Sequence, residues 1–302
     1  MMNDRLIRSL FRLFSYGVSA VLAVCIIVFS VSTAAALTLG DIDYTAKYFT
    51  SSKVVNMLAE NLDKEYEELS RKTDVPKEVY MNATGAGLIS SVQRTVIKNT
   101  QTSIFVDFSG TINIENRLRE SIEKYDNESG IRHTEKQVEK LISQAVDVFN
   151  QTCSIANNAQ LSKIASLVNN HSLQITFISA VGIIACIFAE HFLNGGRRKS
   201  LNYVAMAMVT AGEVLAAFCV IVLLSGRLGN LSLTNIEAYN IAIASASKTV
   251  LIILFAVGIL ITAAGFSVFY AVYRYYRTKL MDSDTENEIA KNLIRNNENE
   301  SD

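Results

Sequence analysis

Residues 249–273 read TVLIILFAVGILITAAGFSVFYAVY and contain no Asp, Glu, Lys, Arg or Pro. An α-helix of about twenty apolar residues is long enough to cross about 30 Å of hydrocarbon. Three more stretches are apolar over a similar length, namely 13–39, 173–193 and 202–226. The sequence therefore predicts an integral membrane protein that crosses the bilayer four times.

The rest of the chain is also predicted to be helical. It has one proline, Pro76, and no glycine between Gly40 and Gly85 or between Gly130 and Gly182. Proline and glycine are the strongest breakers of helices, so their scarcity favours long helices. The predicted fold class is all-α: a four-span transmembrane helical bundle with an extracytoplasmic helical domain inserted between spans 1 and 2.

Positive charge flanks the apolar stretches on alternate sides. Basic clusters precede the first stretch, fill the loop between the second and third, and follow the fourth: Arg5, Arg8 and Arg12; Arg197, Arg198 and Lys199; Arg274, Arg277 and Lys279. Basic residues close to a span stay in the cytoplasm. We therefore expect a multi-pass protein of the plasma membrane with both termini in the cytoplasm.

This topology divides the chain into segments of alternating location. They are a cytoplasmic N-terminus (1–12), the first span (13–39), an extracytoplasmic helical domain (40–172), the second span (173–193), a cytoplasmic loop (194–201), the third span (202–226), an extracytoplasmic loop with a helix extension (227–248), the fourth span (249–273) and an acidic cytoplasmic tail (274–302).

The N-terminus also has features of a secretory signal peptide. An Arg-rich start and an apolar run are followed by the small residues Ala34, Ala35 and Ala36. The run of about 24 residues is longer than the 7–15 of a usual signal core, which favours an uncleaved signal anchor. The alternative, cleavage after Ala36, would leave three spans and an N-terminus outside the cell.

The extracytoplasmic segment is predicted to fold as amphipathic helices. Apolar residues recur every three or four positions over 54–69, which predicts a helix of about twenty residues. Asp74 followed by Pro76 predicts the start of the next helix, with the aspartate as its cap and the proline in its first turn. Glycines Gly85 and Gly87 then interrupt the following apolar stripe.

The second half of this segment is predicted in the same way. Ile104, Phe105, Val106 and Phe108 form a short apolar cluster that is compatible with a buried strand or with a helix end. A helix carrying Leu118 and Ile122 is expected to end at Gly130. Thr134 and Gln137 have the spacing of a capping box, which begins a helix that runs into the second span or pauses only near 157–158 or 169–170.

A second capping box, Thr234 with Glu237, precedes the fourth span. The helix that it begins would run for about 40 residues to position 276, which corresponds to about 60 Å. We expect the first part of this helix to pack against the extracytoplasmic domain. The acidic tail is expected to be disordered past about residue 296.

Glu213 is the main intramembrane polar candidate, because it lies near the middle of the third span. A charged side chain at that depth costs at least about 2.5–3.5 kcal/mol on insertion scales, so such groups usually face the bundle interior and often have a function. One interpretation is a proton- or cation-linked site. The other is a structural carboxylic acid that hydrogen-bonds a neighbouring helix at Ser30, Ser179, Thr262 or Ser267.

The cytoplasmic interface supplies the other candidates. Glu190 and His191 end the second span, where a charged group can reach water. Arg197, Arg198 and Lys199 fill the short loop that follows. Any cytoplasmic partner is expected to contact this loop or the tail.

Small residues predict close contacts between spans. Gly258 and Thr262 have the small-xxx-small spacing that lets two helices approach, and Gly265 follows one turn later. Packing within the chain is the favoured use, with homodimerisation second. Cys153 continues an apolar helical stripe and is expected to occupy a core position.

The sequence contains no arrangement typical of a catalytic site, a cofactor site or a metal site. We therefore expect a protein that is not an enzyme and that has no cofactor. A net charge of −1 argues against a nucleic-acid partner. The expected partners are the lipid bilayer, one or more unidentified proteins and, as a further option, a second copy of the chain.

Three functions are compatible with this layout. The first is a sensor, accessory or scaffold subunit whose extracytoplasmic domain binds a partner or ligand and couples it to cytoplasmic partners. The second rests on topology: one span, a large outer loop and three more spans resemble the permease subunits of mechanotransmitting ABC systems, such as the bacterial cell-division permease and macrolide-exporter types. That resemblance implies an ATPase partner, although 194–200 lacks the Arg-Glu-Ile-Gly-like coupling segment of those families. The third is an ion- or proton-linked channel or carrier that uses Glu213.

Overall fold

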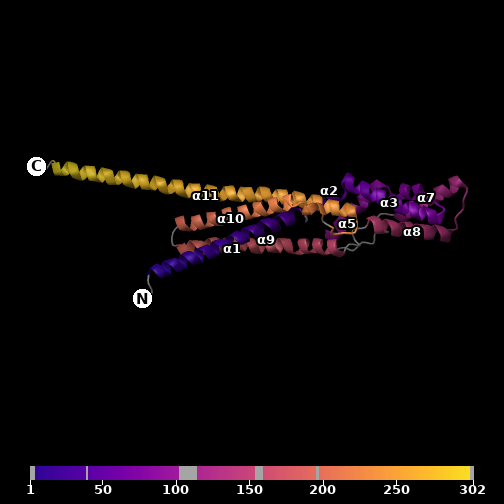
Figure 1. Cartoon of the computed structure of the whole chain (residues 1–302), viewed down its shortest axis with the longest axis horizontal. Helices are drawn as coiled ribbons and strands as arrows, with labels where there is room; N and C mark the ends of the chain where they lie inside the picture. The colour runs from indigo at the N-terminus through magenta and orange to yellow at the C-terminus, as the bar shows by residue number, and fades with distance from the viewer. Residues whose placement is uncertain are drawn as a thin grey trace. The chain divides into compact units, whose positions relative to one another are not determined.

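The computed structural model of the chain describes residues 4–38, 40–101, 114–153, 159–194, 197–230 and 232–299. These residues form helices and contain no strand, so the all-α prediction is confirmed for the described part of the chain (Figure 1). The helices belong to two compact units. The span unit comprises Met1–Val31, Ile175–Val220 and Leu254–Asp302, and the helical domain comprises Ser32–Gln174 and Ile221–Ile253.

Four helical segments are long and apolar enough to cross a membrane, as predicted. They are Ser9–Thr38, His171–Asn194, Arg198–Leu224 and Glu237–Thr278. They belong to four longer helices: α1 (Asp4–Thr38), α9 (Ala159–Asn194), α10 (Arg197–Leu224) and α11 (Glu237–Asn299).

The helical domain contains the shorter helices. They are α2 (Ile42–Phe49), α3 (Ser52–Thr73), α4 (Lys77–Thr84), α5 (Ala86–Gln101), α7 (Ile114–Ser129) and α8 (Glu135–Cys153), with a 3₁₀ turn at Arg227–Asn230. The stripe predicted over 54–69 is the buried face of α3, where Leu58, Leu62 and Tyr66 are fully buried. This face packs against α8, and α4 packs against α7. One apolar core therefore joins all these helices.

The first turn of α11 completes that core, as expected. Tyr239 is fully buried and its ring lies 5.9 Å from that of Phe49 in α2. The Tyr44 hydroxyl donates a hydrogen bond of 3.3 Å to the carbonyl of Ala246. The N-terminal part of α11 is thus a structural element of the helical domain.

Two predicted helix starts are wrong in detail. Asp74 does not cap α4: it ends α3 in the left-handed conformation (φ 53°), and Pro76 takes the position before the first turn of α4. The capping box at Thr234 does not form either, because α11 begins three residues later and the Asn240 carboxamide accepts the Thr234 backbone N–H at 2.9 Å. No side chain caps the start of α4, and before α11 the side chain that bonds the Thr234 backbone is Asn240 and not Glu237.

Other predicted boundaries are confirmed. Gly85 separates α4 from α5, whereas Gly87 lies within α5. Gly130 follows α7 with φ 75°, a conformation that favours glycine. Gln137 accepts the backbone N–H of Thr134 at 2.7 Å, which is its predicted capping role. Residues 104–108 and 157–158 lie outside the described residues, and α9 runs through 169–170 without a break.

The tail differs from the prediction. α11 continues as one helix of 63 residues to Asn299. No glycine or proline follows Gly265 in this stretch, so no residue interrupts the i to i−4 hydrogen bonds.

Small residues hold the span unit together, where α1, α9, α10 and α11 run side by side (Figure 1). A Cβ added to Gly258 of α11 would lie 2.9 Å from the Gly212 carbonyl oxygen and 3.0 Å from the Ala216 nitrogen of α10. A Cβ on Gly265 would lie 3.0 Å from the carbonyl oxygen of Ala205. On another face of α10, Ala207 and Ala211 pack against Leu22 and Ala23 of α1.

This contact predicts the effect of adding one methyl group. Gly258→Ala should destabilise the span unit by about 1–3 kcal/mol, because the new Cβ meets backbone atoms that cannot rotate away. Thermal unfolding in detergent, followed by alkylation of the buried Cys219, measures the change. Gly17→Ala is the matched control, since nothing lies within 4 Å of its added Cβ. If Gly258→Ala and Gly17→Ala lowered the unfolding temperature equally, the close contact between α10 and α11 would be contradicted.

Candidate functional site

The span unit contains a polar pocket of about 570 Å³, which we call the inner pocket. The start of α1, the end of α9, the start of α10 and one residue of α11 line it: Phe11, Arg12, Tyr16, Leu193, Asn194, Lys199, Asn202, Tyr203, Met206 and Phe269. Two of the predicted basic clusters thus contribute to one cavity, through Arg12 and Lys199. The inner pocket combines two cations and two carboxamides with aromatic and aliphatic walls.

A buried polar cluster lies beside the inner pocket. Glu190 is 0% exposed. The Asn194 amide nitrogen lies 2.7 Å from Glu190 Oε2 and 3.0 Å from the Ser15 hydroxyl oxygen. The other carboxyl oxygen, Oε1, has no hydrogen-bond partner among the residues that the structure describes. Glu190 was expected to reach water at the interface. Instead, α1 covers the Glu190 carboxyl group, and Asn194 and Ser15 take the place of water around it.

The aromatic wall of the inner pocket is fixed by contacts between α1 and α10. The rings of Tyr16 and Tyr203 meet edge to face, with centroids 5.3 Å apart and an interplanar angle of 84°. One turn along α1, the Ser19 hydroxyl donates to the Tyr203 carbonyl oxygen at 3.0 Å. These contacts set the separation of the two helices and so the width of the pocket.

The remaining interface candidates are separated from one another. The Arg198 guanidinium carbon lies 4.4 Å from the centre of the Tyr276 ring, a cation–π contact between α10 and α11. His191 is exposed, with its ring against Phe192. Arg197 begins α10, and its side chain lies outside the described part of the chain. Of the two loop cations whose side chains the structure describes, Lys199 lines the inner pocket and Arg198 does not.

Glu213 is exposed on α10 and does not face the bundle interior as expected. None of the four expected hydroxyl partners reaches it, because each donates to a carbonyl of its own helix: Ser30 to Ile26, Ser179 to Ile175, Thr262 to Gly258 and Ser267 to Ala263. Thr262 is one turn from Gly258, where α10 and α11 are too close to admit a carboxylate. The described residues therefore give Glu213 no hydrogen-bond partner.

A second buried polar group lies in the core of the helical domain. The Gln93 amide nitrogen donates to the Cys153 carbonyl oxygen and to the Tyr239 hydroxyl, each at 2.6 Å. The Tyr239 hydroxyl donates to the same carbonyl at 2.5 Å. This group joins α5, α8 and α11 at the point where α8 ends, so its evident role is to hold the three helices in register.

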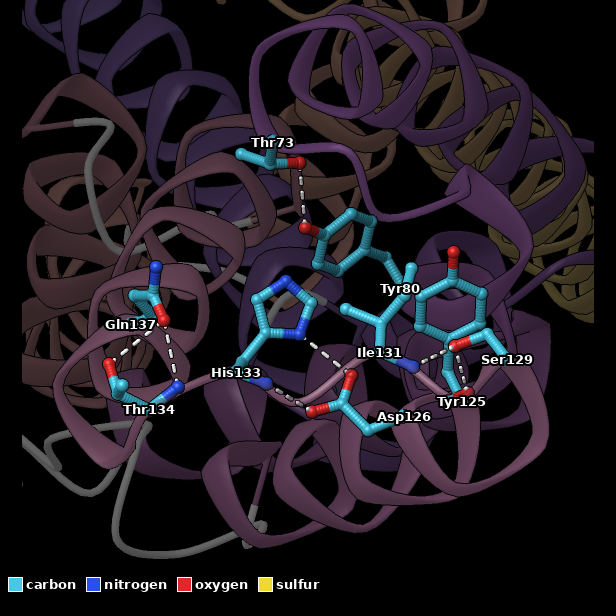
Figure 2. Close-up of polar contacts among 9 residues, drawn as sticks. All are labelled: Thr73, Tyr80, Tyr125, Asp126, Ser129, Ile131, His133, Thr134 and Gln137. Carbon is cyan, nitrogen blue, oxygen red and sulfur yellow. Dashed lines mark hydrogen bonds and ion pairs between the residues drawn. The ribbon is translucent and has the colours of Figure 1, made fainter.

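Polar contacts between α7 and α8 of the helical domain have a local structural role. Figure 2 shows the connection between α7 and α8, where Asp126 accepts the His133 backbone N–H at 3.1 Å and lies 2.7 Å from the His133 ring nitrogen. The Ser129 hydroxyl oxygen accepts the Ile131 N–H at 3.4 Å. These contacts fold the chain back after Gly130. Among the described residues, no group of three His, Cys, Asp or Glu side chains could hold a metal ion.

The chemistry of the inner pocket favours binding of an anionic amphiphile. Arg12 and Lys199 can pair with an oxyanion, and carboxamides can donate to its remaining oxygens. Basic pockets between spanning helices are a common site for phospholipid headgroups. The sequence pattern pointed to Lys199 but not to Asn194, Asn202 or Tyr203. The spacing of Glu190 and Asn194, four residues apart on one helix, was the available signal.

No protein-family model matches this chain, and neither does any curated protein or any solved structure. The inner pocket is therefore interpreted from its own geometry.

The inner pocket predicts selective retention of anionic phospholipid. The double substitution Arg12→Gln, Lys199→Gln should lower the amount of anionic phospholipid that remains with the detergent-purified protein, because both pocket cations are lost. Mass spectrometry of the extracted lipid measures it. Arg227→Gln, which removes an exposed cation far along the chain from the pocket, is the control. The same retention in all three proteins would contradict this use of the pocket.

Proposed function

We propose that this protein is a non-enzymatic plasma-membrane protein that couples an extracytoplasmic binding event to cytoplasmic partners. In this proposal the helical domain lies outside the cell and binds a protein or ligand. The span unit crosses the membrane four times, and both termini lie in the cytoplasm.

The observation that carries the proposal is that helices, and not loops, lead from the helical domain into the span unit. The boundary between the two units falls inside α1 at residues 31–32, inside α9 at 174–175, inside α10 at 220–221 and inside α11 at 253–254. A continuous helix keeps its backbone hydrogen bonds across such a boundary, so a shift or rotation at one end reaches the other. A flexible loop would absorb the same displacement.

The distribution of basic residues supports the proposed orientation. Arg12 and Lys199 line one pocket, and Arg198 contacts Tyr276, which lies between Arg274 and Arg277 in the chain. All three basic clusters are thus represented at one end of the span unit. The positive-inside rule favours a cytoplasmic location for that end.

Two native cysteines allow the coupling to be measured. Cys153 in the helical domain and Cys219 in the span unit are both 0% exposed. Burial raises the pKa of the Cys153 thiol to about 12, so near neutral pH it stays protonated and unreactive until its unit unfolds. Alkylation during a thermal ramp, read by peptide mass spectrometry, reports the opening of each unit separately.

We predict that a cavity in one unit destabilises both. Leu62→Ala removes a fully buried side chain of the helical domain and should cost about 2–5 kcal/mol there. If the shared helices couple the units, the midpoint of Cys219 exposure falls together with that of Cys153. Leu22→Ala, a fully buried site in the span unit, should give the reciprocal result.

Ile131→Ala, at a position that is 41% exposed, is the matched control and should leave both midpoints unchanged. If Leu62→Ala lowered the midpoint of Cys153 exposure but not that of Cys219, the two units would unfold independently. The coupling proposal would then fail.

A further inference from the structure

The exposed carboxyl group of Glu213 lies deep within a segment that is long and apolar enough to span the membrane. Glu213 is fifteen residues after Arg198 and eleven before Leu224, the two ends of that segment. At 1.5 Å per residue these intervals correspond to about 22 Å and about 16 Å. Given the membrane location proposed above, Glu213 is near the middle of the hydrocarbon. Lipid tails offer no hydrogen bond to a carboxyl group. Glu213 therefore needs a polar partner, and that partner must come from another chain.

Glu213 belongs to a regular exposed stripe along α10, which we call the α10 seam. Its residues are all exposed and are spaced alternately four and three apart: Met206, Thr210, Glu213, Ala217, Val220 and Leu224. This is the heptad spacing that keeps one face of a helix against a parallel partner helix. Lys199 lies seven residues before Met206 on the same face of α10. Because Lys199 is charged, the apolar part of the seam begins at Met206.

The other faces of α10 are already occupied within the chain. Gly212 and Ala216 contact α11, and Ala207 and Ala211 pack against α1. These contacts leave the α10 seam open from Thr210 onward, whereas Met206 at its start also lines the inner pocket. Two small residues, Thr210 and Ala217, flank Glu213 by about one turn on either side, and small residues allow two helices to approach closely.

We propose that the α10 seam is the contact face of a parallel homodimer, in which Glu213 of one copy hydrogen-bonds Glu213 of the other. Two copies inserted in the same orientation are related by a two-fold axis along the membrane normal. Each residue on that axis therefore meets its own counterpart at the same depth. Two carboxyl groups that share a proton can hydrogen-bond one another, so a second copy supplies a complementary group at that depth without any other partner.

A foreign spanning helix with a Lys or Arg at that depth is the competing occupant. The second copy is favoured because it presents the same heptad seam, with small residues in register and a polar group at the required height. The two occupants give different products in a cross-linking experiment.

The test uses cysteine cross-linking in native membranes. Ala217→Cys and Thr210→Cys are made in a background with Cys25, Cys186 and Cys219 replaced by alanine, and membranes are oxidised with copper phenanthroline. Both variants should give disulfide-linked dimers several-fold more efficiently than Phe218→Cys or Leu260→Cys, which are exposed on other faces of the span unit. Equal yields at all four positions, or no dimer at the seam positions, would overturn the proposal. Cross-linking of Ala217→Cys to a different protein would overturn it as well.

The role of Glu213 is tested separately with differently tagged copies in detergent. Glu213→Ala should weaken their association roughly three- to thirty-fold, as expected for loss of an interhelical hydrogen bond. Glu213→Gln should retain most of it, because a carboxamide also donates and accepts. Unchanged association in Glu213→Ala would overturn the carboxyl pairing. The fold of each variant is checked in a protein that keeps Cys219. If the Cys219 thiol still resists alkylation, the variant is folded.

Carbonate extraction of the same membranes tests the membrane location on which the inference rests. Protein that remains in the pellet but gives no dimer contradicts the dimer alone. Protein that is released contradicts the membrane location and, with it, the dimer.

Discussion

The contact between backbones of α10 and α11 is the constraint on which the span unit depends. Gly212 and Gly258 face one another where no side chain fits, and Thr262 and Gly265 extend the contact on α11. In hydrocarbon, apolar side chains gain little by exchanging lipid for protein, so helix association depends on close packing and on buried polar contacts. Once α10 and α11 are fixed at this distance, α10 has one face left for α1 and one that its own chain leaves open.

Buried polar groups fix the register of helices in both units. At the inner pocket, Asn194 satisfies one oxygen of Glu190 and ties α9 to Ser15 of α1. In the helical domain, Gln93 and Tyr239 both bond the carbonyl of Cys153. Each group joins helices that are distant in sequence. Such polar contacts specify the register between helices, which apolar packing alone specifies less well.

Sequence periodicity predicted the helices well because length and hydrophobic spacing are local properties. The four apolar segments, the buried face of α3 and the ends at Gly85 and Gly130 all follow from short-range patterns. The starts of α4 and α11 were wrong because Asp74 ends α3 instead of capping α4, and because the Thr234 backbone bonds Asn240 and not the expected Glu237. The surroundings of Glu190 and Glu213 could not be predicted, because they depend on how the helices are rotated about their axes. The Glu190 carboxyl group faces α1 and the Glu213 carboxyl group faces outward, although both residues lie in apolar helices.

Topology is the most direct test of the account, since the proposed coupling needs the helical domain and the inner pocket on opposite sides of one membrane. The measurement is labelling of Ile131→Cys, in the connection between α7 and α8, and of Lys199→Cys, at the inner pocket, with a membrane-impermeant maleimide. The account predicts that intact cells label Ile131→Cys, and that Lys199→Cys reacts only after the membrane is permeabilised. Labelling of Lys199→Cys in intact cells, with Ile131→Cys protected, would contradict it.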